Sequence, residues 1–243
     1  MLDAHCHVDL YPSPTDVAKQ AGRAGVLTVA VTNLPSAFDR SYSHAIQFGH
    51  LRLALGLHPL LAAEHGAELG RFEELLEKTS YVGEVGLDFG PDAPHRDLQV
   101  ASLRCVLKLL QGRRKFISVH SRKAEATLLE LLDEASNPTV VFHWFTGSIA
   151  LAERALGKGH FFSINPAMIR SERGKRLIAI LPKERVLTET DGPFVRIGGR
   201  VCGPEDVAVV ERELAGLWGV SPMSARARIH ENFLGLVRKA SIR

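Results

Sequence analysis

Short apolar runs alternate with longer stretches of helical spacing from one end of this 243-residue chain to the other. Several of the runs are nearly continuous in β-branched or aromatic residues, as strands covered on both faces are. We predict eight strands, at 2–7, 26–32, 52–56, 81–85, 116–120, 139–143, 160–164 and 185–188. The clearest helical segments are 98–110, 124–132, 204–218 and 222–236, the last two beginning with a proline that suits a first helical turn.

Strands that each precede a helical segment, repeated eight times in about 250 residues, are typical of one (β/α)8 TIM barrel. An open doubly wound sheet has the same alternation, and counting elements does not separate the two folds. The sequence shows no linker rich in Pro, Ser or Gly and no internal repeat. We therefore predict an α/β protein with a single domain over residues 1–243.

The composition is that of a globular protein, with 45% hydrophobic and 23% charged residues. We expect no association with a membrane, because no apolar run approaches the ~18 to 20 residues of a membrane helix. The first residues lack the pattern of a secretory signal, and the three scattered cysteines suit a reducing cytoplasm. A net charge of +3 is too small to indicate nucleic-acid binding by itself.

Two histidines, His5 and His7, lie two residues apart on the first predicted strand. Residues with this spacing point to the same face of a strand, and in a barrel that face is the interior. Two imidazoles in an apolar interior need a shared partner, and a divalent metal is the obvious one. Taken alone, however, this pair is more typical of two hydrogen-bonded histidines.

Four further polar residues fall at the ends of predicted strands. Glu84 ends the fourth strand between glycines, His120 and His143 end the fifth and sixth, and Asp191 follows the eighth. Barrel active sites are built at the carboxyl ends of the strands. Four imidazoles and two carboxylates are enough ligands for two divalent ions, such as Mg²⁺, Mn²⁺ or Zn²⁺, with Glu84 well placed to bridge them.

Other residues at the same end of the predicted barrel suit a polyanionic substrate. His58 ends the third strand. It is an extra metal ligand, a hydrogen-bond donor to substrate phosphate or a loop histidine fixed by Pro59. Trp144 can stack on a base or pack in the core. Glu189 and Asp206 either hydrogen-bond to the metal ligands or lie at the surface. Basic residues on these loops, which are either solvated or bind phosphates, are Arg122, Arg170, Arg173, Lys175, Arg176, Arg196 and Arg200.

In order along the chain, these motifs resemble the TatD family of metal-dependent deoxyribonucleases. The resemblance implies a barrel of the metal-dependent hydrolase type, two divalent ions and hydrolysis of single-stranded or duplex DNA. It assigns His5, His7, Glu84 and Asp191 to one ion, and Glu84, His120 and His143 to the other. The matching segments are DAHCH at 3–7, GLHP at 56–59, GEVGLD at 83–88, HSR at 120–122, FHWFTG at 142–147, FSINP at 162–166, ETDGP at 189–193 and NF at 232–233.

The chain departs from the common family pattern after Asp191. Gly192 stands where Ser or Ala is usual, and the usual Arg-Asn is replaced by a glycine-rich loop at 196–200. Together with Trp144 and the stretch 188–194, this loop resembles that of the TatD-like nucleases of Qat antiphage systems. The narrower resemblance implies a role in bacterial antiphage defence, with other defence-system proteins as partners.

The residues support a two-metal hydrolysis in which Glu84 and Asp191 are the catalytic residues. The ions lower the pKa of a bound water from ~15.7 towards ~7, Asp191 accepts its proton, and Arg122 and the later arginines hold the flanking phosphates. A second hypothesis is that the protein is an amidohydrolase that cleaves C–N bonds of small molecules. Such barrels commonly carry a carbamylated lysine where this chain has Glu84. A non-catalytic subunit of a defence complex is a third, and it leaves the buried charges without a purpose.

Overall fold

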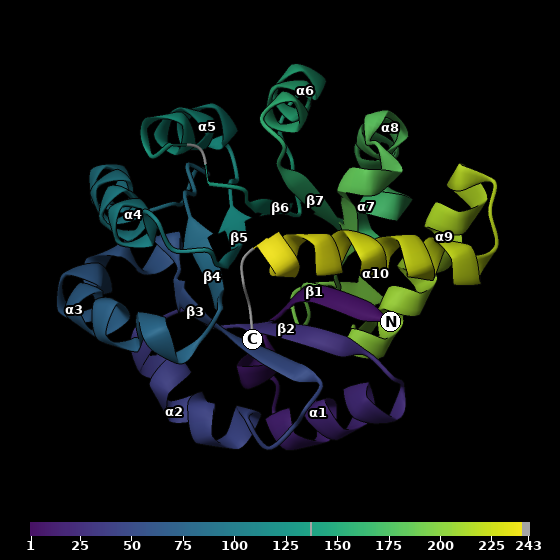
Figure 1. The fold of residues 1–243 in the computed structure, drawn as a ribbon, viewed down its shortest axis with the longest axis horizontal. Coiled ribbons are helices and arrows are strands. Elements are labelled where there is room, and N and C mark those ends of the chain that lie inside the picture. Colours follow the sequence, from purple (N-terminus) through teal and green to yellow (C-terminus); the bar gives the residue numbers. More distant parts are fainter. Residues whose placement is uncertain (137, 240–243) are drawn as a thin grey trace.

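The computed structural model describes residues 1–136 and 138–239, and its main sheet has eight parallel strands in sequential order (Figure 1). Hydrogen bonds join the last strand to the first: Thr188 Oγ1 donates to the Leu2 carbonyl at 2.5 Å, and Asp191 N–H to the His5 carbonyl at 3.0 Å. The (β/α)8 barrel is confirmed and the open sheet is excluded. The strands are β1 Leu2–Cys6, β2 Leu27–Val31, β3 Leu51–Leu57, β4 Tyr81–Gly86, β5 Phe116–His120, β6 Val141–His143, β7 Phe161–Ile164 and β8 Val186–Thr188.

Helices surround the sheet (Figure 1). The helical segment predicted at 204–218 is divided into a 3-10 turn, Pro204–Asp206, and the helix α9, and residues 137 and 240–243 of the predicted domain lie outside the described residues. A short hairpin of β9 (Arg196–Ile197) and β10 (Arg200–Val201) follows the eighth strand and was not predicted. The helices are α1 Pro14–Arg23, α2 Pro35–Ala45, α3 His65–Leu75, α4 Arg96–Leu110, α5 Glu125–Glu134, α6 Ile149–Gly157, α7 Pro166–Arg170, α8 Glu172–Ile180, α9 Val207–Trp218 and α10 Pro222–Lys239.

Buried strands explain why the apolar runs were continuous rather than alternating. Every residue of β4, β6 and β8 is buried, because helices cover one face and the barrel interior the other. Aromatic side chains fill the space between β6 and β7: the Phe142 ring stacks on Phe162 at 5.7 Å, and Phe145 meets Phe162 edge-on at 5.2 Å. Full burial of each such ring contributes roughly 1.5–3 kcal/mol to folding.

The helix α10 closes the barrel at the amino ends of the strands (Figure 1). Its Phe233 ring packs against Phe116 at 5.7 Å and Tyr81 at 6.4 Å, the first residues of β5 and β4. Its Asn232 side chain donates to the carbonyls of Lys183 and Val186, just before and at the start of β8. The opposite end, where the strands' carboxyl ends lie, is left for the site.

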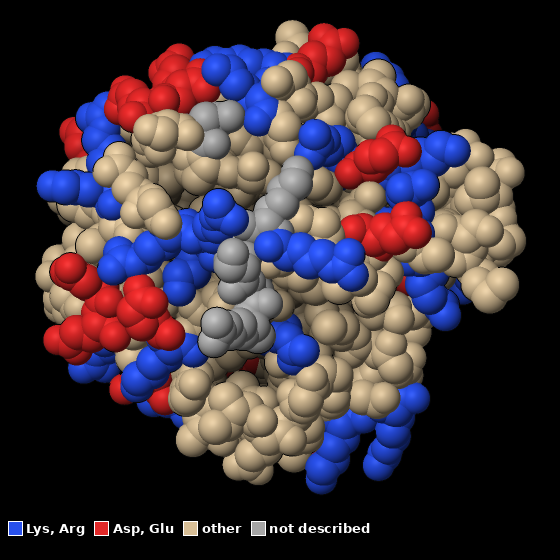
Figure 2. All heavy atoms as spheres, viewed as in Figure 1, with Lys and Arg blue, Asp and Glu red and all other residues tan. Residues whose placement is uncertain are grey.

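Figure 2 shows the face that α10 crosses, with Lys and Arg side chains lying beside Asp and Glu side chains around its margin. Such mixing of the two signs is typical of a solvated surface. Among the described helices, none combines the length and the apolar character needed to cross a bilayer.

Candidate metal centre

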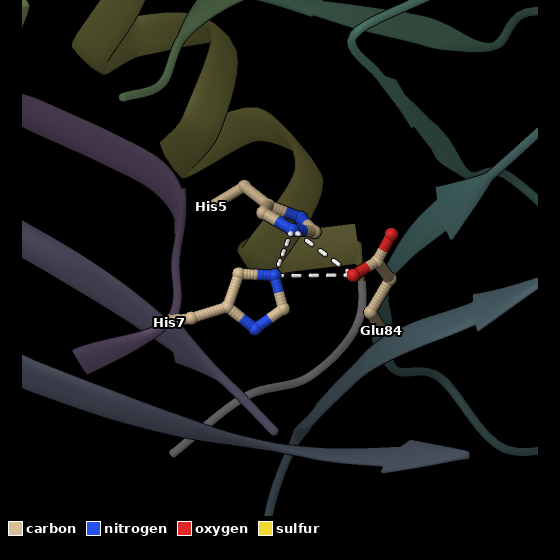
Figure 3. A group of neighbouring side chains, drawn as sticks. All are labelled: His5, His7 and Glu84. Atoms are coloured by element: carbon tan, nitrogen blue, oxygen red, sulfur yellow. Dashed lines mark hydrogen bonds and ion pairs between the residues drawn. The ribbon is translucent and has the colours of Figure 1, made fainter. Parts of the chain in front are cut away.

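The end of β1 places two imidazoles beside one carboxylate oxygen (Figure 3). His7 Nε2 lies 3.1 Å from Glu84 Oε2, and His5 Nε2 lies 3.6 Å from the same oxygen. The two Nε2 atoms are 3.3 Å apart. His5 is held in this orientation by the Ser118 hydroxyl, 2.7 Å from its Nδ1. The three side chains therefore face a common point inside the barrel.

The other oxygen of Glu84 faces a second pair of imidazoles. Glu84 Oε1 lies 2.6 Å from His120 Nδ1 and 2.8 Å from His143 Nε2, and these nitrogens are 3.2 Å apart. The carboxylate thus lies between two histidine pairs, one from β1 and one from β5 and β6. This is the placement that the sequence analysis expected of a bridging ligand.

Asp191 lies beside His5 and His7, and its surroundings indicate whether these residues suit a metal. Its Oδ1 lies 3.7 Å from the Nε2 atoms of both His5 and His7. This oxygen is buried and has no hydrogen-bond partner within residues 1–136 and 138–239. Burying a carboxylate oxygen without a hydrogen-bond partner costs free energy, and a bound cation would remove that cost. The donor set therefore fits divalent ions.

Burial and neighbouring charges set the protonation of this cluster. Burial would raise the pKa of Glu84, but the adjacent His58, His143 and His120 hold that pKa well below its usual value. Although burial lowers the pKa of His143, the Glu84 charge raises it well above normal overall. Burial raises the pKa of Asp191 to about 7. His143 and Asp191 therefore hold protons at atoms that would bind a cation. Metal binding would release these protons, so the affinity for the metal should increase as the pH rises.

Two further carboxylates lie behind the histidines, and one of them is hydrogen-bonded to its histidine. Asp88 Oδ2 lies 2.9 Å from His120 Nε2, and Glu189 Oε1 lies 3.7 Å from His143 Nδ1. The sequence left Glu189 undecided, and the structure buries it completely. Asp88 was not proposed as a site residue, although its place four residues after Glu84 was the available signal. Glu189 also accepts hydrogen bonds from Trp144 N–H, the Asn165 side chain and the Ser163 hydroxyl.

A cavity of about 730 Å³ opens over the candidate metal centre. Three predicted substrate-binding residues, His58, Arg122 and Trp144, line it. His58 Nε2 lies 3.3 Å from Glu84 Oε2, so a third imidazole faces that oxygen. Arg173, one of the basic residues considered for phosphate binding, also lines it. The lining residues that were not predicted for substrate binding include Asn33, Leu60, Leu61, Lys123 and Phe194.

Three other predicted substrate-binding arginines lie outside the cavity lining, as far as the described residues define it. Arg200 forms a two-point ion pair with Asp206, at 2.6 and 2.7 Å. Arg170 donates to the Arg196 carbonyl, and Arg196 to the Gly199 carbonyl. The β9–β10 hairpin and the Asp206 carboxylate hold these guanidinium groups, and their contact with substrate stays a prediction.

The unusual glycine after Asp191 has a structural reason. A Cβ atom at Gly192 would lie far inside van der Waals contact of the Tyr11 hydroxyl and 2.7 Å from the Cys202 carbonyl oxygen. Tyr11 donates a hydrogen bond to that carbonyl, and the Gly192 carbonyl accepts from His7 N–H at 2.8 Å. Gly192 therefore lets Tyr11 connect the loop after β1 to the segment that carries Asp191.

We expect Gly192→Ala to destabilise the protein by about 1–3 kcal/mol, the usual cost of an overpacked site. In a Tyr11→Phe background the same substitution should cost less, with a coupling energy on the order of 1 kcal/mol. Urea denaturation of the four proteins in the cycle measures this. Gly216→Ala is the control, since a Cβ at Gly216 meets nothing within 4 Å. Equal costs in both backgrounds would show that Tyr11 is not the obstacle.

Comparison with known proteins gives a consistent result along nearly the whole chain. A family model described as TatD related DNase matches residues 2–238. Deoxyribonuclease TATDN3 of Homo sapiens is 28% identical over 242 residues, covering 91% of this chain and 88% of the relative. The 3'-5' ssDNA/RNA exonuclease TatD of Erwinia amylovora is 29% identical over 188 residues, covering 73% and 71%. The crystal structure of the TatD homologue YjjV from Escherichia coli K12 has a TM-score of 0.89, 29% identity and 97% coverage of both chains.

Proposed function

Because this chain belongs to the TatD related DNase family, a family of metal-dependent hydrolases, we propose that it hydrolyses phosphodiester bonds of DNA by a two-metal mechanism. The observation that carries the proposal is the Glu84 carboxylate, each of whose oxygens lies against a separate pair of histidines. A carboxylate with imidazole pairs on both sides would be able to serve two divalent ions.

The residues divide into two ligand groups around Glu84. We assign His5, His7, Glu84 and Asp191 to one ion, and Glu84, His120 and His143 to the other. When bound, such ions supply Lewis acidity toward phosphate oxygens and lower the pKa of water to about 7. Mg²⁺, Mn²⁺ and Zn²⁺ all accept combinations of imidazole and carboxylate ligands.

The chain's own residues supply the proton transfer and the positioning. The Asp191 carboxylate, whose Oδ1 is buried without a hydrogen-bond donor in the described part of the site, would hold one ion and accept the proton of the water. Asp88 hydrogen-bonds to His120 and fixes its orientation, while the Glu189 carboxylate lies 3.7 Å from His143 Nδ1. Arg122, whose side chain is 57% exposed at the cavity, attracts the DNA backbone.

We assign DNA as the substrate, taken as single strands or at duplex ends. The names of the human and Erwinia amylovora relatives support a nuclease. The position of Glu84 supports it over a small-molecule amidohydrolase, since those barrels commonly carry a carbamylated lysine at the end of the fourth strand. Turnover of cyclic amides without cleavage of any nucleic acid would reverse this assignment.

We also propose that the protein acts in bacterial antiphage defence, together with other proteins of a defence system. The support is the resemblance of residues 188–194, of the glycine-rich loop at 196–200 and of Trp144 to the Qat-type nucleases. Cells carrying the complete system are challenged with phage, with wild-type protein or with Glu84→Gln. Protection that is lost in the variant supports a catalytic role, and full protection by the variant would favour a non-catalytic subunit.

Cleavage should depend on added metal. Purified protein is treated with EDTA and incubated with single-stranded, blunt-duplex and overhang-bearing DNA, with and without Mg²⁺, Mn²⁺ or Zn²⁺. We expect no cleavage in EDTA and recovery on addition of at least one ion. The same ion, at about 100 times its Kd, should raise the free energy of unfolding by roughly 2.7 kcal/mol. Cleavage that persists in EDTA, or its absence with every ion, contradicts the proposal.

A further inference from the structure

The lining of the cavity has two chemically different sides. The loop after β5 supplies Arg122 and Lys123, and the start of α8 supplies Arg173, whose guanidinium also donates to the carbonyls of Thr146 and Gly147. The loops after β3 and β8 supply Leu60 and Phe194. Because the strands follow one another in order around the barrel, the cationic residues and the residues Leu60 and Phe194 lie on different arcs of the mouth, with the candidate metal centre between them. Trp144, which follows β6, lies on the cationic arc.

Phe194 is a large apolar side chain that is exposed beside the candidate metal centre. It is 58% exposed although it lines the cavity, so its ring contributes little to the core. Its N–H donates to the Asp191 carbonyl at 2.9 Å, which fixes it to the turn that carries the predicted proton acceptor. Its ring meets the His7 ring edge-on, with the centroids 5.1 Å apart. An exposed aromatic face is therefore presented beside the candidate metal centre.

Leu60 extends this apolar arc from the loop after β3. Its side chain is 40% exposed and its N–H donates to His58 Nδ1 at 3.2 Å. That bond leaves His58 Nε2 directed at Glu84, so Leu60 is tied to the same centre. Exposed apolar side chains lining a cavity are typical of a ligand site rather than of a folding requirement.

We propose that Phe194 and Leu60 form a subsite for the nucleobase next to the scissile phosphate, while Arg122, Lys123 and Arg173 hold the backbone phosphates on the other side. This inference rests on the proposed nuclease function and deepens it. A nucleotide has one flat apolar part and one anionic part, and the two arcs match them in chemistry. Stacking on Phe194 depends on whether a base is present and on its size, and not on its hydrogen-bonding edge, because every base has a π-face.

The test compares oligonucleotides that differ only at the terminal nucleotide, which carries adenine, thymine or an abasic tetrahydrofuran, placed at either end in turn. For wild-type protein we expect kcat/KM for the adenine terminus to exceed that for the abasic terminus about tenfold, with thymine between them. In Phe194→Ala the ratio should fall towards one, and Phe194→Trp should retain it. Leu217→Ala, which removes a comparably exposed side chain (59%) on α9, is the matched control and should leave the ratio unchanged.

Binding without catalysis gives a second readout. With EDTA present, an oligonucleotide ending in 2-aminopurine should lose fluorescence on binding wild-type protein, and this quenching should be absent in Phe194→Ala. Arg122→Gln should instead weaken binding of all termini alike and reduce the slope of log K against log salt by about 0.7. Cleavage with an unchanged base ratio, or persistent quenching, in Phe194→Ala overturns the subsite alone. No cleavage of any DNA by wild-type protein overturns the proposed function and this inference with it.

Discussion

Replacing Glu84 by glutamine is expected to lower DNA cleavage by on the order of a thousandfold or more, with little change in the size of the side chain. The amide keeps the volume but loses the charge, and its nitrogen faces imidazole nitrogens that require an acceptor or a shared cation. Because each oxygen of Glu84 lies against a separate histidine pair, both proposed ion sites should weaken together. The two measurements are the cleavage rate at saturating metal and the number of ions bound, from calorimetric titration of protein freed of metal.

Glu211→Gln is the matched control for this variant. Glu211 is also almost fully buried, but it pairs with Arg226 at 2.9 Å and does not line the cavity. The control should bind the same number of ions as wild-type protein and cleave DNA at a comparable rate. Equal cleavage by wild-type protein and by Glu84→Gln, or by Glu84→Ala, would refute the assignment of the active site.

The candidate metal centre could be located from the sequence because the positions of its residues follow from chain topology. Apolar runs located the eight strands to within two residues, and parallel strands in a barrel bring their carboxyl ends to one mouth. His120 and Glu84 could then be placed together although 36 residues separate them. A one-residue slip would turn polar side chains such as Glu84 and His120 from the barrel interior to the face that the helices cover, so their side-chain direction fixes the register.

The substrate-binding side was less predictable, since it depends on loops. The hairpin at 196–201 consists of two-residue strands, too short to show any periodicity. Whether Arg200 faces substrate or a protein carboxylate depends on Asp206, whose position only the folded chain defines. The exposure of Phe194 likewise depends on the turn after Asp191 and has no counterpart in hydrophobic patterning.

Asp191→Asn should separate the proposed proton acceptor from the bridging ligand. Asparagine retains an oxygen near His5 and His7 but has neither the charge nor the ability to take a proton at neutral pH. We expect kcat to fall by about 10² to 10⁴. KM for DNA should change little, because Arg122 and the other cations of the lining remain in place.

The ions bound by Asp191→Asn give the sharper distinction. His120 contacts only Glu84 among the predicted ligand carboxylates in the described structure, whereas a ring nitrogen of His143 also lies within 4.8 Å of an Asp191 oxygen. The first ion site should therefore weaken more than the second. Asp206→Asn is the control, because that buried carboxylate pairs with Arg200 outside the cavity lining. A kcat within tenfold of wild type, or equal weakening of both sites, would mean that Asp191 does not have the assigned role. A large loss of kcat with one ion site intact would instead assign proton transfer to Asp191 and the joint binding of both ions to Glu84. The different surroundings of the two carboxylates indicate these two roles.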